Sequence, residues 1–342
     1  MSEGFEPVRL GIAGTGFISG VHAACARRSP YVELVAVASA RGRANRERFD
    51  ELDPAVQLLT IDELFASDDV EAIMVCTRTA DHASHAVEVL KGSKHLLLEK
   101  PGAVTVSGQS LITSAAVEHP ELVARVAYHR RHDARFREVA DRLAAGEIGR
   151  PFAVHLTSRE DYPPSDADLS AGGFIMDVGV HDFDTARWLL GRDPTTVFTH
   201  VHAPVYRESD VDNAYITIAL GDAAATVNLS RTSTFGMDIR CEVVGPGGVI
   251  RIAEPAVGSD LAVLSSASAK AFPADCRDRF RDAYQAQMDA FARACRGEAT
   301  DGATLEDDGW AVATAVAARA SGSRGERLDI GPSWDWNPGP SG

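Results

Sequence analysis

The chain has little cysteine, no long apolar run and a shortage of positive charge. Its five cysteines are scattered along 342 residues without a CxxC pair, which fits reduced thiols rather than disulfides or a zinc knot. No apolar segment approaches the roughly 20 residues of a membrane-spanning helix. The short acidic start also lacks the positive and apolar regions of a signal peptide. We therefore expect a cytoplasmic protein.

Positive charge is scarce relative to negative charge. Lysine and arginine together number 34 against 49 aspartates and glutamates, which gives a net charge of -15. Such a chain repels the phosphates of nucleic acids and of anionic lipids. We expect a small molecule as its partner, and neither nucleic acid nor membrane.

The length suggests two domains, and the first half alternates short apolar runs with helical stretches. This alternation is typical of βαβ units around a parallel sheet. We predict that residues 1–127 form a Rossmann dinucleotide-binding domain. The expected strands are Val8–Ile12, Glu33–Ala38, Ala72–Cys76, His95–Leu98 and Leu122–Tyr128, and the expected helices include Gly20–Arg28, Ala44–Glu51, Ile61–Ala66 and His82–Lys91.

After Tyr128 the rhythm changes to strands that alternate apolar and polar residues. This pattern predicts a second domain, residues 128–342, built on a largely antiparallel open sheet. The fold class is thus α/β followed by α+β. The expected strands are Phe152–Thr157, Val197–Val205, Ala214–Leu220, Ala224–Ser230 and Ile239–Val244, and the expected helices are Ala134–Ala145, Arg279–Cys295 and Leu305–Ala320.

A glycine-rich turn follows the first expected strand. Gly14 and Gly16 permit a tight turn and a close approach of a pyrophosphate to the start of the next helix, and Ser19 takes the place of the third glycine. An ordinary turn is the alternative, but strand, glycines and helix in this order favour a cofactor. The residues expected around the pyrophosphate are Gly14, Thr15, Gly16, Phe17 and Ile18.

The end of the second expected strand indicates which dinucleotide is bound. An acid there would accept hydrogen bonds from the ribose 2′-OH of NAD, but Ser39-Ala40-Arg41 offers none. Ser39 can donate to a 2′-phosphate and Arg41 can clamp it. The alternative is a solvated, arginine-rich helix start. We expect NADP as the cofactor, with NAD as the second choice.

Two segments carry candidate catalytic residues. Lys100 follows a strand and precedes a proline, so it projects from a constrained turn at the ligand-binding edge of the sheet. Asp177 and His181 are four residues apart and would share one face of a helix, where a carboxylate can orient an imidazole that acts as a base. The alternatives are a surface lysine and a buried structural histidine. We expect no metal, because these residues supply too few well-spaced ligands.

Further motifs stand in order along the chain after the Rossmann start. They are Cys76–Thr77 with His82, Lys94–His95 before Glu99–Lys100–Pro101, Arg130–Asp133, Thr157–Arg159, Gly172–Asp177 with His181–Asp184, Gly236–Gly245, and Arg279–Tyr284. Together with the Rossmann start these motifs resemble the glucose-fructose oxidoreductase/inositol dehydrogenase (Gfo/Idh/MocA) family over nearly the whole length. The last four motifs resemble its inositol 2-dehydrogenase branch.

The resemblance implies that Lys100, Asp177 and His181 are the catalytic residues and that the Lys100–Pro101 bond is cis. It also implies a dimer or tetramer joined through the open face of the second sheet. Thr157, Arg159 and His155 are weaker candidates for substrate contacts from the second sheet, and the alternative is that they are ordinary strand residues. The cofactor contacts that we expect beyond the glycine turn are Ser39 and Arg41, as argued above from the sequence, with Thr77, His82, Glu99 and Lys100. The expected substrate contacts are Lys100, Arg159, Asp177, His181 and Phe235.

This chain also departs from the family pattern. Arg78 and Thr79 stand where the family often has proline and asparagine, and Ser39 stands where the branch usually has aspartate. The branch often shows tyrosines around Phe235 and Met237. Fewer phenolic hydroxyls change which hydroxyl pattern a polyol site accepts, so the substrate need not be myo-inositol.

These observations predict reversible oxidation of a ring hydroxyl of an inositol or a related pyranose sugar to a ketone. His181 would take the hydroxyl proton, Lys100 would hold the oxygen, and Asp177 would orient His181. One alternative is an NADPH-dependent reductase of a sugar-derived or small ketone or imine. Another is a regulator that binds NADP without turnover.

Overall fold

The computed structural model describes residues 5–40, 55–161, 171–202, 206, 210–252 and 272–331. These residues form two compact units, each treated by itself below. The first takes its described residues from Met1–Ala103, Ser107–His132 and Asp282–Asp308, and the second from Val104–Val106, Asp133–Arg281 and Gly309–Gly342. The domain division between residues 127 and 128 stays a prediction.

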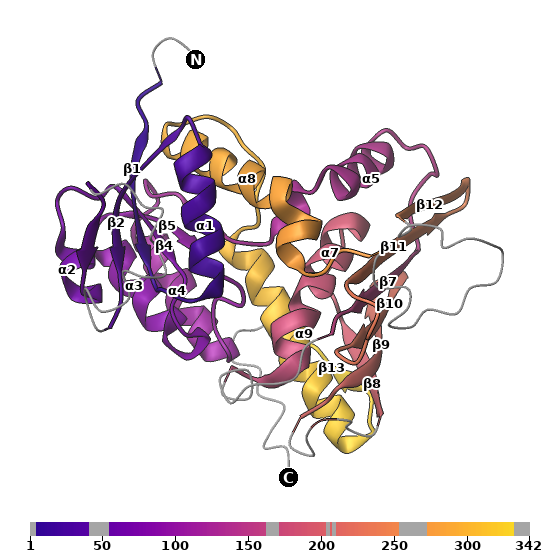
Figure 1. The fold of residues 1–342 in the computed structure, drawn as a ribbon. Helices are drawn as coiled ribbons and strands as arrows, with labels where there is room; N and C mark the ends of the chain where they lie inside the picture. The colour runs from indigo at the N-terminus through magenta and orange to yellow at the C-terminus, as the bar shows by residue number, and fades with distance from the viewer. Residues whose placement is uncertain are drawn as a thin grey trace. The chain divides into compact units, whose positions relative to one another are not determined.

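The first unit contains a six-stranded parallel sheet in the order β3-β2-β1-β4-β5-β6. Figure 1 labels β2, β1, β4 and β5 of this sheet. Apolar residues run through these strands almost without interruption, because helices cover parallel strands on both faces. The predicted Rossmann fold is confirmed. The strands are β1 (Val8–Ala13), β2 (Val32–Ala38), β3 (Gln57–Leu59), β4 (Ala72–Val75), β5 (His95–Leu98) and β6 (Ala124–Val126).

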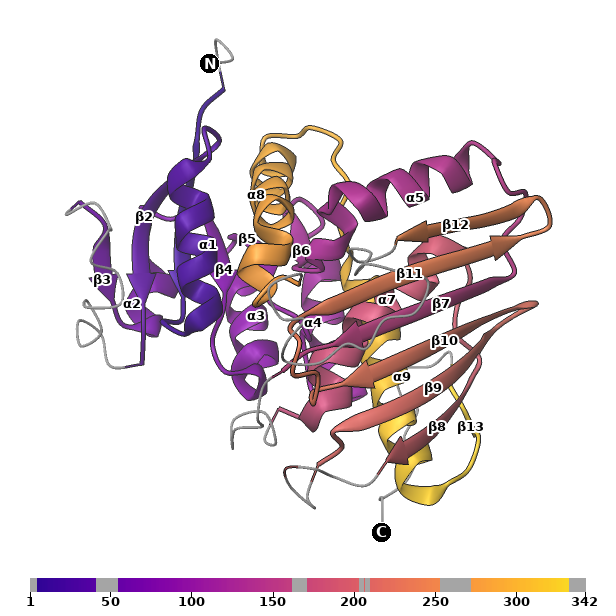
Figure 2. The same cartoon turned by 45° about the vertical axis from the view of Figure 1, so that its right-hand side comes forward.

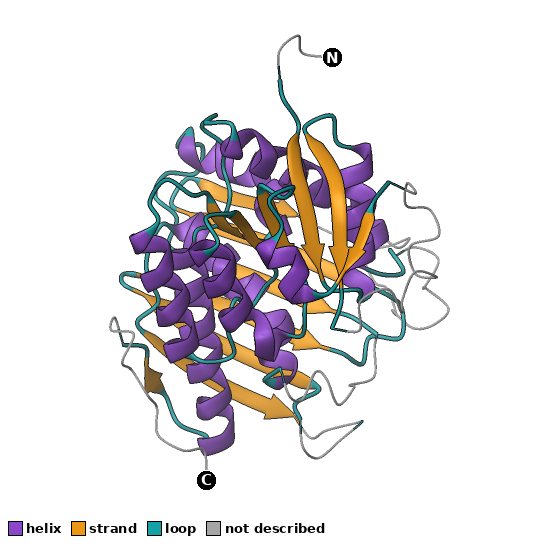
Figure 3. Cartoon of the chain, turned by 90° about the vertical axis from the view of Figure 1, so that its left-hand side faces the viewer, coloured by secondary structure: helices purple, strands orange, loops and turns teal. Residues whose placement is uncertain are grey.

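Helices and strands alternate along much of this part of the chain, and Figure 3 shows helices beside the strands. The expected helices Ile61–Ala66 and His82–Lys91 are observed at those residues, while Ala44–Glu51 lies outside the described part of the chain. Sequence patterning missed β3, whose three half-exposed residues are too few to show a period. The helices are α1 (Phe17–Arg28), α2 (Ile61–Ala66), α3 (His82–Lys91) and α4 (Val106–Glu118), with short turns η2 (Thr79–Asp81) and η3 (His129–His132).

Residues from near the end of the chain complete the first unit. They come from α8 (Cys276–Cys295) and from the first turn of α9 (Leu305–Arg324). Asp308 accepts hydrogen bonds from the Tyr128 hydroxyl at 2.7 Å and from the Gly102 N–H at 3.0 Å. The loop after β5 is therefore fixed by a residue more than 200 positions further along the chain.

The second unit is built on a seven-stranded sheet in the order β12-β11-β7-β10-β9-β8-β13 (Figure 2). Only the β7–β10 pair is parallel among the described pairings, so the predicted largely antiparallel sheet is confirmed. The strands are β7 (Ala153–Arg159), β8 (Thr196–His202), β9 (Asn213–Leu220), β10 (Ala223–Ser230), β11 (Asp238–Gly245), β12 (Gly248–Ile252) and β13 (Leu328–Asp329).

One face of this second sheet is packed, and no described helix covers the other, which is called the open face below. Buried residues alternate with exposed ones along β9 and β10, as expected where one face packs on a core. Ser321 in α9 accepts a hydrogen bond from Thr199 N, and Ser158 in β7 donates to Asp182 in α7 (Val180–Leu190). The packed face therefore carries α7 and the second-unit part of α9.

Two further helical elements belong to the second unit. They are α5 (Ala134–Ala144) and the π-helical turn η4 (Ile175–Gly179), which leads directly into α7. Within the described residues, no helix combines the length and apolarity that crossing a bilayer requires.

Candidate active site

The glycine-rich turn lies at the carboxyl end of β1. Gly14 has a φ of +122°, and a Cβ on it would lie 2.3 Å from the carbonyl oxygen of Cys76, so only glycine fits. Around Gly16 the opposite holds, since a Cβ there would meet nothing within 4 Å. This open space adjoins the first N–H groups of α1, where no side chain caps the helix. Such a cradle fits a dinucleotide pyrophosphate.

Ser39 stands directly after β2 and is 7% exposed. Its N–H donates to Leu59 O at 3.1 Å, which ties the end of β2 to β3. The sequence puts no carboxylate at this point, as the prediction of NADP requires. Arg41, the second residue of that prediction, lies outside the described residues.

His82 connects the ends of two neighbouring strands. Its Nδ1 lies 2.8 Å from Pro101 O and its Nε2 lies 3.2 Å from Thr77 O. Burial lowers the pKa of His82, although both carbonyls and Glu99 favour the charged form. The Thr77 hydroxyl is 2.9 Å from His85 Nδ1. Thr77 and His82, both expected at the cofactor, are thus brought together at the same edge of the sheet.

Lys100 follows β5, and its peptide bond to Pro101 is cis. The carboxylate of Glu99 accepts hydrogen bonds from His22 Nε2 at 2.7 Å and from the Lys100 N–H at 3.0 Å. Burial, together with the nearby Glu99 charge, raises the pKa of the Cys76 thiol well above its usual value. Cys76 is therefore a neutral neighbour of this turn and not a nucleophile.

The segment that carries Asp177 and His181 begins at two glycines with positive φ. Gly172 and Gly173 have φ values of +99° and +74°, and a Cβ on Gly173 would lie 2.4 Å from Asp210 Oδ1. The Asp210 carboxylate accepts a hydrogen bond from Phe174 N, with 3.3 Å to each oxygen. Asp210 therefore caps the start of this helical segment.

Arg231 holds the Asp210 carboxylate in place. Its side chain is completely buried, pairs with Asp210 at 3.0 Å and stacks 4.5 Å above the Phe174 ring. Sequence reasoning missed both Asp210 and Arg231. Neither residue stands in a recognisable motif. Arg231 directly follows β10 and Asp210 precedes β9, and only the fold brings the two side chains together.

Asp177 is half-buried in the π-turn η4, and His181 is 8% exposed in the first turn of α7. A π-turn adds a residue to one helical turn and is frequent at functional sites. It changes the angular spacing on which the prediction of a shared face was based. The catalytic roles of Asp177 and His181 stay predictions.

Arg159 lies on the face of the second sheet opposite Ser158, and Ser158 points at α7. Its guanidinium donates to Asn228 at 2.8 Å and to the buried Asp238 at 3.3 Å. His155 shares this face and lies 2.7 Å from the Thr226 hydroxyl. The substrate roles of Arg159, His155 and Thr157 stay predictions.

Phe235 occupies a turn before β11 that packs against the segment before α8. Its ring lies 5.1 Å from the Phe272 ring, and Gly236 has a φ of +104°. Met237 N donates to Pro273 O at 3.0 Å. The turn is therefore held in place, while the substrate role of Phe235 stays a prediction.

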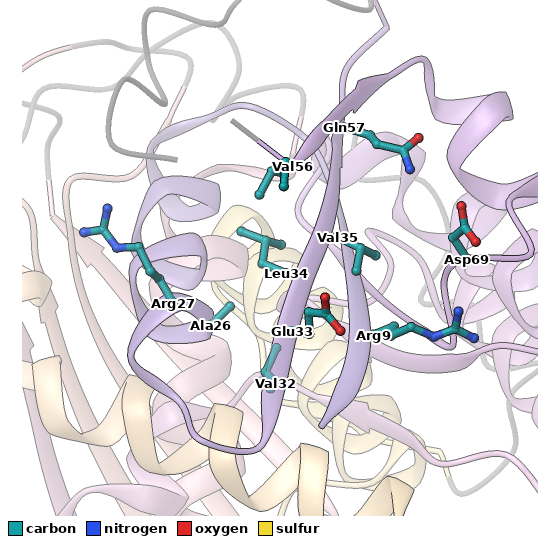
Figure 4. A pocket seen from close by; sticks show the side chains of 11 residues that line it. Arg9, Ala26, Arg27, Val32, Glu33, Leu34, Val35, Val56, Gln57 and Asp69 are labelled. Atoms are coloured by element: carbon teal, nitrogen blue, oxygen red, sulfur yellow. The ribbon is translucent and has the colours of Figure 1, made fainter. Parts of the chain in front are cut away.

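A surface cavity of about 400 Å³ opens elsewhere on the first unit (Figure 4). It is lined by the first half of β2 and the end of α1, among them Val32, Glu33 and Arg27. None of the predicted site residues lines it, and Ser39 stands at the other end of β2. Among the described residues there is also no cluster of three potential metal ligands.

Taken separately, the two units define a class of protein. The first has a pyrophosphate cradle, and a lysine on a fixed turn follows a strand at the same edge of its parallel sheet. These features, with the second, open-sheet unit, are those of an oxidoreductase that binds a nicotinamide dinucleotide.

Comparison with known proteins identifies the family. The profile "Oxidoreductase family, NAD-binding Rossmann fold" matches residues 8–128, and the profile "GFO/IDH/MocA C-terminal domain" matches residues 136–251. A scyllo-inositol 2-dehydrogenase (NAD(+)) of Bacillus subtilis is 30% identical over 86% of this chain and 87% of its own. The chain belongs to the GFO/IDH/MocA family of oxidoreductases, which confirms the resemblance.

Other relatives extend this likeness along the chain. A myo-inositol 2-dehydrogenase of Thermotoga maritima is 26% identical over 92% of this chain and 96% of its own. The crystal structure of a putative myo-inositol dehydrogenase from Sinorhizobium meliloti is 26% identical, with a TM-score of 0.84 over 95% of this chain and all of that one. The two-unit fold is therefore shared over almost the full length.

Proposed function

We propose that this oxidoreductase reversibly oxidises a ring hydroxyl of an inositol, or of a related pyranose sugar, to a ketone, with a preference for NADP. The observation that carries the proposal is the turn of Glu99, Lys100 and Pro101 beside the glycine cradle. The near full-length likeness to relatives named inositol 2-dehydrogenases supports the substrate class.

The proposed roles follow from the chemistry of each side chain. When bound, the cofactor supplies a carbon that accepts the hydride. His181 takes the hydroxyl proton as general base, and Asp177 orients its ring. Lys100 holds the substrate oxygen as negative charge develops on it. Lys100 belongs to the first unit, whereas Asp177 and His181 belong to the second.

The cofactor contacts that we propose lie in the first unit. Gly14, Thr15, Gly16, Phe17 and Ile18 would hold the pyrophosphate, and the space above Gly16 supports this role. Ser39 and Arg41 would receive a 2′-phosphate, because the sequence provides no acid where NAD needs one. The further proposed contacts near the nicotinamide are Thr77, His82, Glu99 and Lys100.

The substrate contacts that we propose are Lys100, Asp177, His181 and Phe235. The side chain of Arg159 lies on the sheet face turned away from α7, which carries His181, so we do not place it with them. Phenylalanine at residue 235 offers a ring face and no hydroxyl, so the favoured polyol need not be myo-inositol. A preference for NADP also favours a second candidate, in which the enzyme reduces a sugar-derived or small ketone or imine. The same residues would then act in reverse, with His181 donating the proton.

We further propose that the protein forms dimers or tetramers through the open face of the second sheet. Tyr215 is 59% exposed and Phe198 is 39% exposed on this face. They come from the neighbouring strands β9 and β8, where Phe198 pairs with Thr217. Exposed aromatic side chains on an extended sheet are typical of a surface that binds another protein.

Initial rates on a panel of cyclitols and pyranoses, each with NAD and with NADP, test the proposal. We expect at least one inositol to be oxidised, with NADP preferred, and His181→Ala to lower kcat by about 100-fold or more. Dinucleotide binding, measured by fluorescence titration, should persist in His181→Ala. If no polyol reacts in either direction although the cofactor binds, the dehydrogenase proposal is wrong. The reductase is then tested with ketones, and a regulator would show binding alone.

A further inference from the structure

The turn that carries Lys100 is fixed by side chains at three consecutive backbone positions. Lys100 N donates to Glu99 Oε2 at 3.0 Å, and Pro101 O lies 2.8 Å from His82 Nδ1. Gly102 N donates to Asp308 at 3.0 Å. Only the first of these bonds is made by Lys100 itself. The orientation of Glu99 therefore bears directly on where the Lys100 side chain begins.

Glu99 is in turn held by His22 of α1. The distance from His22 Nε2 to Glu99 Oε1 is 2.7 Å, and the two side chains are 0% and 7% exposed. An ionised carboxylate can only accept, so Nε2 is the donor wherever Glu99 acts as the acceptor. His22 Nδ1 has no hydrogen-bond partner among the described residues. The ring therefore points one polar atom at Glu99 and the other into packed surroundings.

The surroundings of the pair strengthen this bond. The His22 ring lies edge-on to Tyr284 of α8, with 5.6 Å between centroids, and Tyr284 packs at 4.6 Å from the His129 ring. Tyr284 is 4% exposed, so little water reaches the contact. A hydrogen bond to a carboxylate in such a dry site is stronger than the same bond in water.

Through this pair, Glu99 joins two parts of the first unit. His22 is in the second turn of α1, the helix that begins at the glycine cradle. One carboxylate oxygen faces that helix, and the other faces the backbone of Lys100. Removing His22 would leave Glu99 free to rotate and would release the Lys100 N–H.

We propose that His22 is a positioning residue that acts through Glu99 to hold Lys100 in its working orientation. This inference rests on the proposed function, in which Lys100 holds the substrate oxygen. His22 itself would touch neither substrate nor the reacting carbon.

The test compares substitutions at two buried or half-buried histidines of the same unit. His22→Leu removes the donor to Glu99, and His22→Gln restores an N–H near the Nε2 position. His95→Leu is the matched control, because His95 Nδ1 accepts a hydrogen bond from Val123 N at the other end of β5. This hydrogen bond does not involve the Lys100 turn. His95→Leu therefore removes a structural hydrogen bond of a histidine without disturbing the contact between Glu99 and Lys100.

We expect His22→Leu to lower kcat by about 10- to 100-fold, since a displacement of about 1 Å at a catalytic group has effects of this size. The KM for the polyol and the Kd of the dinucleotide should stay within about threefold of the wild type. His22→Gln should recover most of kcat, and His95→Leu should change it little. A purely structural role for His22 would not lower kcat while leaving KM and the dinucleotide Kd almost unchanged.

A spectroscopic measurement makes the test independent of turnover. The chain has only four lysines, Lys91, Lys94, Lys100 and Lys270. Reductive methylation with 13C-formaldehyde therefore gives few resonances, and Lys100→Met identifies the one that belongs to Lys100. We expect this resonance to shift or broaden in His22→Leu and in Glu99→Gln but not in His95→Leu. Glu99→Gln also serves if His22→Leu does not fold.

The outcomes separate the two proposals. If the wild type oxidises no polyol, the proposed function fails, and the Lys100 resonance still decides whether His22 positions this lysine. An unchanged Lys100 resonance in both His22→Leu and Glu99→Gln would overturn the inference. So would a His22→Leu enzyme with wild-type kcat, a His22→Gln enzyme no better than His22→Leu, or a loss of dinucleotide binding equal to the loss of kcat.

Discussion

At the scale of single residues, the structure separates side chains that hold the backbone from side chains that await a ligand. The Nε2 atom of His22 and the carboxylates of Glu99 and Asp308 are all hydrogen-bonded to neighbouring groups of the first unit. Around Gly16 there is instead open space, and it is the space that fits a cofactor. Roles therefore depend on which atoms are already occupied, as well as on residue type.

Ser39 decides cofactor choice in our proposal, so an acid at this position should reverse it. We expect Ser39→Asp to lower kcat/KM with NADP by about 10-fold or more, because a carboxylate repels the 2′-phosphate, and to raise kcat/KM with NAD. The measurement is initial rates with both dinucleotides at one polyol concentration. Ser39→Asn has a similar size and no charge, and it is the control. Equal ratios in Ser39→Asp and wild type would contradict the role of Ser39.

The buried His82 should make stability depend on pH. Burial lowers its pKa below the ordinary value of 6.5 in the folded chain. As the pH falls, the unfolded chain takes up a proton at this histidine before the folded chain does. The contribution of His82 to the free energy of unfolding is therefore constant above about pH 6.5 and decreases as the pH drops below that value. We expect His82→Asn, which keeps a donor for Pro101 O and cannot titrate, to lessen this fall. Urea unfolding of the wild type and of His82→Asn at about pH 7.5 and about pH 5.5 measures this pH dependence. An equal loss of stability in both proteins would contradict the role of His82.

At the scale of elements, the predicted strands and helices that lie within the described residues are observed, while the predicted helix Ala44–Glu51 lies outside them. The buried strands of the first sheet and the alternating strands of the second differ because one sheet is covered on both faces and the other on one. The sequence prediction did not name the strands β3, β12 and β13 or the helix α4. The three strands are too short to show a period, and β12 directly follows a glycine-rich turn.

The turn between β1 and α1 should respond differently at its two glycines. Gly14→Ala places a Cβ against Cys76 O at a positive φ, so we expect its Tm to fall by roughly 5 °C or more, or folding to fail. Gly16→Ala meets no atom within 4 Å, so its Tm should change little. Its dinucleotide Kd should still weaken by about 10-fold, because the added Cβ enters the space proposed for the pyrophosphate. Thermal unfolding and fluorescence titration distinguish these effects. A Gly16→Ala protein that binds normally would place the pyrophosphate elsewhere.

At the scale of the whole molecule, the chain forms two compact units whose residues are not simply consecutive. Residues from Asp282–Asp308 pack with the first unit although they follow the whole second sheet. The second unit leaves one broad face of its sheet turned away from α7 and α9, as Figure 2 shows. That face is where we propose that copies of the chain meet.

A charge on this open face should break the proposed oligomer. We expect the wild type to sediment as a dimer or tetramer and Tyr215→Glu to shift to a smaller species, because a buried unpaired charge is costly. Leu111→Glu is the matched control, since Leu111 is 63% exposed on α4 of the first unit. Sedimentation velocity measures the change. A Tyr215→Glu protein of wild-type mass would exclude this face as the interface.

The sequence by itself determined the parallel sheet, the largely antiparallel sheet and the glycine turn, because each depends on local periodicity or on backbone freedom at one residue. It also carried enough ordered motifs to identify the family.

Roles for Lys100, Asp177 and His181 came from that likeness and stay predictions. Only the tertiary structure decided what surrounds them. The bond of His22 to Glu99 spans 77 residues and the bond of Gly102 to Asp308 spans 206. Contacts of this kind leave no pattern in a single sequence, because they form only where distant segments fold against each other.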